Sequence, residues 1–149
     1  MDYKKKNKNF FRVATILVVI NLFSAISGST KYNDSQILKL LSNHCKTNIK
    51  ITKLGANIYT EKTKRTFQLE ISSTEAEANK NLIHAFSVLF KLGAYAQDPI
   101  QKCKLIIHIE NYDIPVIAIC DYKCSKKYFL SHKLKEKEWR DNCLIIRTI

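Results

Sequence analysis

The chain has 149 residues, of which 46% are hydrophobic, and this is the size and composition of a single globular domain. Only 3 glycines and 2 prolines occur, so collagen-like, low-complexity and long flexible-linker architectures are excluded. Lys and Arg number 25 against 13 Asp and Glu, and the net charge of +12 favours attraction to polyanions.

The N-terminal segment has the order of features that is typical of a secretion signal. Several lysines come first, an apolar run from Val13 to Phe23 follows, and small residues come after it. The run is shorter than the roughly 20 apolar residues of a stable membrane span. Ala25-Ile26-Ser27 supplies small side chains one and three residues before a cut. We therefore expect a signal peptide over residues 1–27 and one domain over residues 28–149, with an uncleaved membrane anchor as the alternative.

Export would leave a strongly basic domain in an oxidising compartment. Removing residues 1–27 removes five basic side chains and one acidic one, which leaves 20 Lys and Arg against 12 Asp and Glu, a net charge of +8. We expect the protein to be secreted, or to reside in the periplasm or cell envelope. All five cysteines belong to this domain, and disulfides are permitted there. An odd number leaves at least one thiol free or paired between chains.

The first half of the domain alternates helical and strand patterns. Asn33 and Asp34 are good N-cap residues, and the apolar spacing after them predicts a helix over 34–46. Isoleucines 49, 51 and 58 predict a strand that is bent or bulged near Gly55. A charged turn over 61–65 precedes a second strand, in which Phe67, Leu69 and Ile71 alternate with polar residues.

A long amphipathic helix should follow. Thr74-x-x-Glu77 has the pattern of a capping box, and a broad apolar face continues from Leu82 to Leu92. Pro99 cannot continue a helix, so we expect the end near Gln97. Gly93 inside this helix indicates close packing.

Two apolar strands, 105–109 and 116–120, predict a hairpin. A turn centred on Tyr112 and Asp113 would pair Asn111 with Ile114 and place Pro115 opposite Glu110 at a site without a ladder hydrogen bond. The same register would place Lys104 opposite Asp121, a favourable pair. One face would then carry Leu105, Ile107, Ile109, Val116, Ala118 and Cys120, and the other Ile106, Ile117 and Ile119.

The C-terminal segment should contain a short helix over 131–141 and an edge strand at Leu144-Ile145-Ile146. The predicted order is α-β-β-α-β-β-α-β. Strand, helix and strand over about 66–110 suggest a crossover connection. We therefore predict an α+β fold, with a small antiparallel or mixed sheet and one long central helix on one face.

No catalytic or metal motif stands out. The chain lacks G-x-S-x-G, H-E-x-x-H and a glycine-rich phosphate loop. Cys120, Cys124, His132 and Cys143 have a spacing that zinc permits, but no second close pair supports it. We therefore assign no catalytic residue, metal or cofactor. The favoured disulfide is Cys124–Cys143, which would close a loop of about 20 residues, and Cys103–Cys120 is the competing pair.

Two surfaces are candidates for binding. The first is a basic segment with interleaved aromatics, which can bind polyanions: Lys123, Lys126, Lys127, Lys133 and Lys137 with Tyr128 and Trp139. The alternative is a solvated lysine-rich surface whose aromatics belong to the core. The second surface is the face of the hairpin with Ile106, Ile117 and Ile119, which would be an interface unless the first or last helix covers it.

These observations favour a non-catalytic binding or envelope-associated domain. Its partner would be a protein or an anionic polymer or lipid. Nucleic acid is not expected, and membrane contact is expected only through an uncleaved N-terminal segment. The alternative is a small secreted hydrolase or a thiol-based redox protein.

Overall fold

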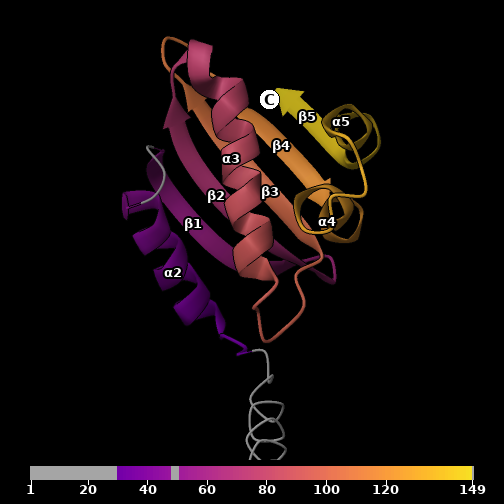
Figure 1. Ribbon diagram of the computed structural model, residues 1–149. Coiled ribbons are helices and arrows are strands. Elements are labelled where there is room, and N and C mark those ends of the chain that lie inside the picture. Colours follow the sequence, from indigo (N-terminus) through magenta and orange to yellow (C-terminus); the bar gives the residue numbers. More distant parts are fainter. Residues whose placement is uncertain (1–29, 48–50, 149) are drawn as a thin grey trace, which may run out of the picture. The chain divides into compact units, whose positions relative to one another are not determined.

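The computed structural model describes residues 30–47 and 51–148. The predicted signal peptide, its cleavage site before Gly28 and the predicted strand residue Ile49 lie outside the described residues. Within these ranges the fold is α+β, as predicted, with a mixed sheet of five strands and four helices (Figure 1). In chain order the elements are α2 (Asp34–Thr47), β1 (Thr52–Glu61), β2 (Lys64–Ser73), α3 (Glu75–Gly93), β3 (Lys102–Ile109), β4 (Val116–Asp121), α4 (Tyr122–Phe129), α5 (Glu136–Cys143) and β5 (Leu144–Thr148).

The strands follow one another across the sheet in chain order, β1-β2-β3-β4-β5. Strands β2 and β3 are parallel, and α3 connects them as a crossover. The other three pairs are antiparallel. Within the described residues, the edges are therefore β1 and β5, the first and last strands in chain order.

The described helices share one core with one face of the sheet, and α3 lies in front of that face in Figure 1. Phe67, Leu69 and Ile71 of β2 alternate with polar residues and are fully buried, as the period of two predicts. They form one core with the buried residues of α2 and of α3, the longest of the described helices with 19 residues. Helices α4 and α5 join this core through Phe129 and Trp139, whose rings contact Phe86 of α3.

The opposite face of the sheet has no helix of the described chain over it (Figure 1). Ile106 pairs directly with Ile117, and Ile119 pairs with Ile145 of β5. The side chains of Ile106, Ile117 and Ile119 are half-buried, and that of Ile145 is exposed. The suggestion that the first or last helix covers the isoleucines of the hairpin was therefore wrong. We call this side of the sheet the open face.

The predicted register of the β3–β4 hairpin was wrong by two residues. Lys102, not Lys104, lies opposite Asp121. The connection is longer than the predicted turn because Asn111 adopts a left-handed conformation with φ 68°, and the Glu110 amide donates to the Ser73 carbonyl at 3.0 Å. This hydrogen bond keeps the end of β3 beside β2. The shift is even, so every predicted inward and outward assignment in the hairpin still holds.

The C-terminal segment contains two helices where one was predicted over 131–141. Helix α4 begins directly after β4. Asp121 caps the N-terminus of α4, because its side chain accepts a hydrogen bond from the Cys124 amide at 2.9 Å. A connection that includes His132 at φ 51° then leads to α5. Helix α4 was not predicted because its many lysines leave too few apolar residues to form a helical pattern in the sequence.

Two further details concern β1 and α3. The bulge predicted near Gly55 is present, between Lys53 and Gly55. Helix α3 begins after Thr74 as predicted, but the Thr74 side chain makes no capping hydrogen bond. The helix ends at Gly93 rather than near Gln97, because the Gln97 amide donates instead to the Tyr32 carbonyl at 2.8 Å.

Candidate functional site

A groove of about 880 Å³ lies on the open face, between the β1–β2 turn and the junction of α5 with β5. Its apolar surface comes from Ile117, Ile119 and Ile145. Ile119 and Ile145 are directly paired across β4 and β5, so their side chains lie side by side on the same face. The register therefore builds an isoleucine floor from two strands.

Five basic side chains line this floor: Lys62, Lys64, Lys102, Lys104 and Arg147. Lys102 and Lys104 flank the buried Cys103 on β3, so both lie on the open face. Lys104 lies opposite Ile119, and Arg147 of β5 lies opposite Ile117. Cations thus border the isoleucines on both sides.

Two acidic residues, Glu61 and Asp121, also line the groove. Asp121 lies opposite Lys102 in the β3–β4 register, and its side chain caps α4. Glu61 lies opposite Lys64 in the β1–β2 register. Against five cations, these two carboxylates leave a net positive lining, which is suited to an anionic ligand.

The β1–β2 turn brings Lys62 and Lys64 to the groove in an unfavourable backbone conformation. Glu61 and Lys64 are paired, so Lys62 and Thr63 form a two-residue turn with φ of 45° and 71°. Such turns favour Asn and Gly, and a β-branched residue at positive φ is strained. Backbone strain of this kind occurs most often at functional sites.

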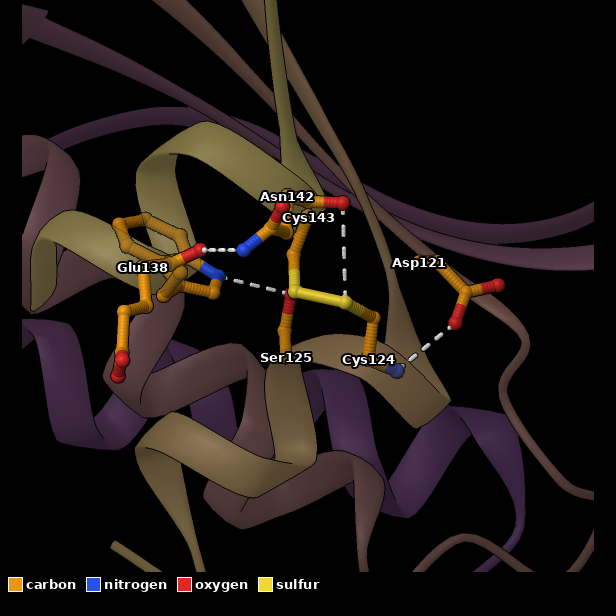
Figure 2. The surroundings of a disulfide bond; sticks show 7 residues. Asp121, Cys124, Ser125, Glu138, Asn142 and Cys143 are labelled. Atoms are coloured by element: carbon orange, nitrogen blue, oxygen red, sulfur yellow. Dashed lines mark hydrogen bonds between the residues drawn. A yellow bond between two sulfur atoms is a disulfide. The ribbon is translucent and has the colours of Figure 1, made fainter. Parts of the chain in front are cut away.

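The other end of the groove is held by a disulfide, Cys124–Cys143, the pairing that the sequence favoured (Figure 2). The Cα atoms lie 5.6 Å apart, and the bond joins α4 to the last residue of α5. Asn142 and Cys143 line the groove, and Asn142 is tied to the Glu138 carbonyl by its side-chain amide at 2.9 Å. The disulfide therefore fixes the point at which β5 begins.

Beneath the disulfide lies a buried polar contact. The Trp139 indole N–H donates to the Ser125 hydroxyl at 2.8 Å, and both residues are fully buried. This bond satisfies the only polar atom of the Trp139 side chain and positions α5 against α4. Trp139 is a core residue, so its ring is not accessible to a ligand.

The basic segment predicted from sequence lies elsewhere on the molecule. Lys123, Lys126 and Lys127 belong to α4, Lys133 to the connection after it, and Lys137 to α5. All five are exposed, and none lines the groove. Tyr128 is half-buried and stacks on Trp139 with 5.3 Å between ring centres. A binding role for these lysines stays a prediction, without the accessible tryptophan it invoked.

The remaining cysteines are buried thiols. Cys103 and Cys120 lie directly opposite each other on β3 and β4. Burial raises the pKa of Cys120 to about 12 and that of Cys103 well above its ordinary value. Burial also raises the pKa of Cys45, against a smaller opposing effect of Lys53. All three thiols are thereby kept in their unreactive protonated form.

The described part of the chain contains neither a metal-ligand group nor a membrane-spanning helix. Cys124 and Cys143 are bonded to each other, so the zinc set considered from sequence loses two of its four ligands. Across residues 30–47 and 51–148 there is no group of three or more His, Cys, Asp or Glu that could hold a metal ion. Nor does any helix in these ranges have the length and apolar character needed to cross a membrane.

Comparison with protein-family models found no match to the chain, and comparisons with curated proteins and with solved structures found none. The groove itself is therefore the best indication of what the protein does. Sequence reasoning singled out Ile117 and Ile119 but missed Lys102, Lys104 and Arg147 as a group. The available signal was the alternation of Lys102 and Lys104 about Cys103, which places two cations on the face opposite the core.

Proposed function

We propose that this protein is a non-catalytic binding domain that takes an acidic partner protein in the groove of its open face. One observation carries the proposal: five cations and an isoleucine floor share one groove on the side of the sheet without a helix from the described chain. Complementary charge steers association and selects partners, while buried apolar contact supplies affinity.

The isoleucines favour a protein over a purely ionic polymer. A polyanion such as a sulfated polysaccharide would use the lysines and leave Ile119 and Ile145 exposed to water. A flat lipid surface would contact the rim of a groove better than its floor. A polypeptide with carboxylates and apolar side chains can satisfy both parts of the lining.

The state of the thiols favours binding over thiol chemistry. A reactive cysteine needs an accessible site and a lowered pKa. Cys45, Cys103 and Cys120 are buried, and burial raises their pKa values. We place the partner outside the cytoplasm or in the cell envelope, in accord with the signal peptide expected over residues 1–27.

The test compares two charge-reversal variants with equal change in charge. Lys102→Glu/Lys104→Glu changes the groove, and Lys126→Glu/Lys127→Glu changes exposed lysines of α4 outside it. The probe is a random copolymer of Glu and Tyr, which carries both carboxylates and apolar rings. We expect the groove variant to weaken binding by roughly tenfold or more, the α4 variant to have little effect, and added salt to weaken binding to the unaltered protein.

Two further probes separate the alternatives. Heparin tests a polyanion without apolar side chains, and phosphatidylglycerol vesicles test an anionic membrane. The proposal requires the Glu/Tyr copolymer to bind more tightly than either. Equal binding of vesicles or heparin, or a loss of binding in the α4 variant alone, would reject the groove and favour the lysines predicted from sequence.

A further inference from the structure

In the part of the chain that the structure describes, strand β5 is an edge strand that pairs on one side only. Its partner is β4, in a register from Val116 opposite Thr148 to Cys120 opposite Leu144. Within the described residues no strand pairs with its other side. Alternate backbone N–H and C=O groups of β5 therefore face outward, which is the template used in recognition by strand addition.

The two edges of the sheet differ in how they are protected. Strand β1 has a bulge between Lys53 and Gly55, and it packs beside α2, where Lys53 donates to the Ser42 hydroxyl at 3.2 Å. Strand β5 pairs without a register shift and contains no proline. Bulges and prolines are common means of blocking edge pairing. Their absence from β5 leaves this edge competent to accept another strand.

The side chains of β5 indicate what such a strand would carry. Arg147 lies on the open face and lines the groove, with the four lysines of the groove beyond it. Ile146 lies on the opposite face, and 53% of its surface is exposed. In an added strand, side chains alternate between these two faces. Acidic residues toward Arg147 and apolar residues toward Ile146 would match both faces of β5, while the parts of the partner that flank this segment would cover the isoleucine floor.

We infer that the partner binds through an extended acidic segment, which adds to the sheet as a sixth strand beside β5. This inference rests on the proposed function of the groove and names the partner's conformation and its pattern of alternating acidic and apolar residues. The backbone pairing supplies affinity, and the charge of the groove supplies selectivity.

A second copy of the same chain is a poorer occupant. Pairing of two β5 strands would bring together two domains that each carry a net charge of +8 over residues 28–149. Like charge on both sides disfavours association. An acidic segment instead neutralises part of the positive lining.

The test uses octapeptides in which Asp alternates with Val, and the unaltered purified protein. Two peptides have identical side chains but carry N-methyl groups on either the Asp amides or the Val amides. A strand that pairs by one edge directs only one of these two sets toward β5. We expect one methylated peptide to bind as the unmodified peptide does and the other to lose binding. Amide exchange of β5 should slow in the bound state.

Charge variants test whether Arg147 selects an acidic strand. Arg147→Glu should weaken binding of the Asp/Val peptide by roughly tenfold and allow a Lys/Val peptide to bind, while the matched variant Lys126→Glu should do neither. Equal binding of both methylated peptides, together with loss of binding in Lys102→Glu/Lys104→Glu, would overturn strand addition but preserve the proposed function. Failure of the Asp/Val peptide and the Glu/Tyr copolymer to bind at low salt would overturn both. A dimer seen by sedimentation that the peptide dissociates would identify a second copy as the occupant and reject the inference.

Discussion

Gly93 of α3 lies directly against the ring of Tyr122, the first residue of α4. A β-carbon built on Gly93 would come 3.0 Å from Cε2 of Tyr122. The ring cannot easily move, because its hydroxyl donates to the Phe90 carbonyl at 2.9 Å and the Phe90 ring lies 4.8 Å away. The glycine thus sets how closely α4 approaches α3.

Gly93→Ala should therefore destabilise the protein. The change gains up to about 1 kcal/mol in helix propensity, but overpacking against a fixed ring costs about 1–3 kcal/mol. We expect a net loss of roughly 1 kcal/mol in the free energy of unfolding, measured by urea denaturation. Gly55→Ala is the matched control, since its β-carbon would meet the half-buried Glu70 side chain at 3.3 Å. An unchanged or increased free energy of unfolding in Gly93→Ala would show that Tyr122 yields readily.

Removing the Cys124–Cys143 disulfide should cost stability and loosen the groove. The bond spans a sequence separation of 19, which corresponds to about 3 kcal/mol in the chain-entropy model. Cys124→Ser/Cys143→Ser should lower the free energy of unfolding by that order and weaken binding of the Glu/Tyr copolymer, because Cys143 immediately precedes β5. Cys45→Ser, which changes a free thiol, is the control. Unchanged unfolding in the double variant would show that the bond constrains little.

The buried thiols should react only after unfolding. Because burial raises the pKa of Cys120 to about 12, its thiol stays protonated in the native state at pH 8. Iodoacetamide should then modify Cys103 and Cys120 no faster than the protein unfolds, as followed by mass spectrometry across a urea series. Rapid alkylation of the native protein would instead support the thiol-based alternative.

The same pKa shift has a consequence for stability at high pH. Folding raises the pKa of this thiol above its ordinary value of 9.0. Its contribution to stability is therefore complete below pH 9, where the thiol is protonated in both the folded and the unfolded chain. Above pH 9 the unfolded chain ionises first, so stability should fall progressively up to about pH 12. Cys103→Ala/Cys120→Ala should show a shallower decline over the same range than the unaltered protein does.

Thr63→Gly should stabilise the β1–β2 turn. Thr63 has φ 71°, which glycine adopts without the steric penalty of a β-branched side chain. We expect a gain of about 1 kcal/mol by thermal or urea denaturation. Thr60→Gly, in the regular ladder opposite Arg65, should destabilise the strand instead. Copolymer binding should persist in Thr63→Gly, since Lys62 and Lys64 remain.

Export predicts cleavage between Ser27 and Gly28. N-terminal sequencing of the exported protein should begin at Gly28. Ser27→Leu places a large side chain immediately before the cut and should block processing, whereas Ser29→Leu should not. Recovery of the unaltered full-length chain in membranes would support the uncleaved anchor.

The sequence allowed most elements and their buried faces to be predicted. Alternation of Phe67, Leu69 and Ile71 marked β2, and the helical spacing after Thr74 marked α3, because each pattern depends on the local geometry of the backbone. Local patterns fail where a tertiary contact intervenes. Helix α4 is capped by Asp121 and buries only Ser125 and Phe129, so its lysines concealed it.

Only the tertiary structure decided where the groove lies. The sequence by itself determined that Lys102 and Lys104 point away from the core, since side chains alternate along a strand. It could not determine that Arg147 and Ile145 would complete the same surface, because that depends on β5 pairing with β4 across an intervening helical segment. Nor could it show that the described helices pack on the other face. The direction of a side chain is local, whereas strand neighbours and helix coverage depend on which distant surfaces are buried together.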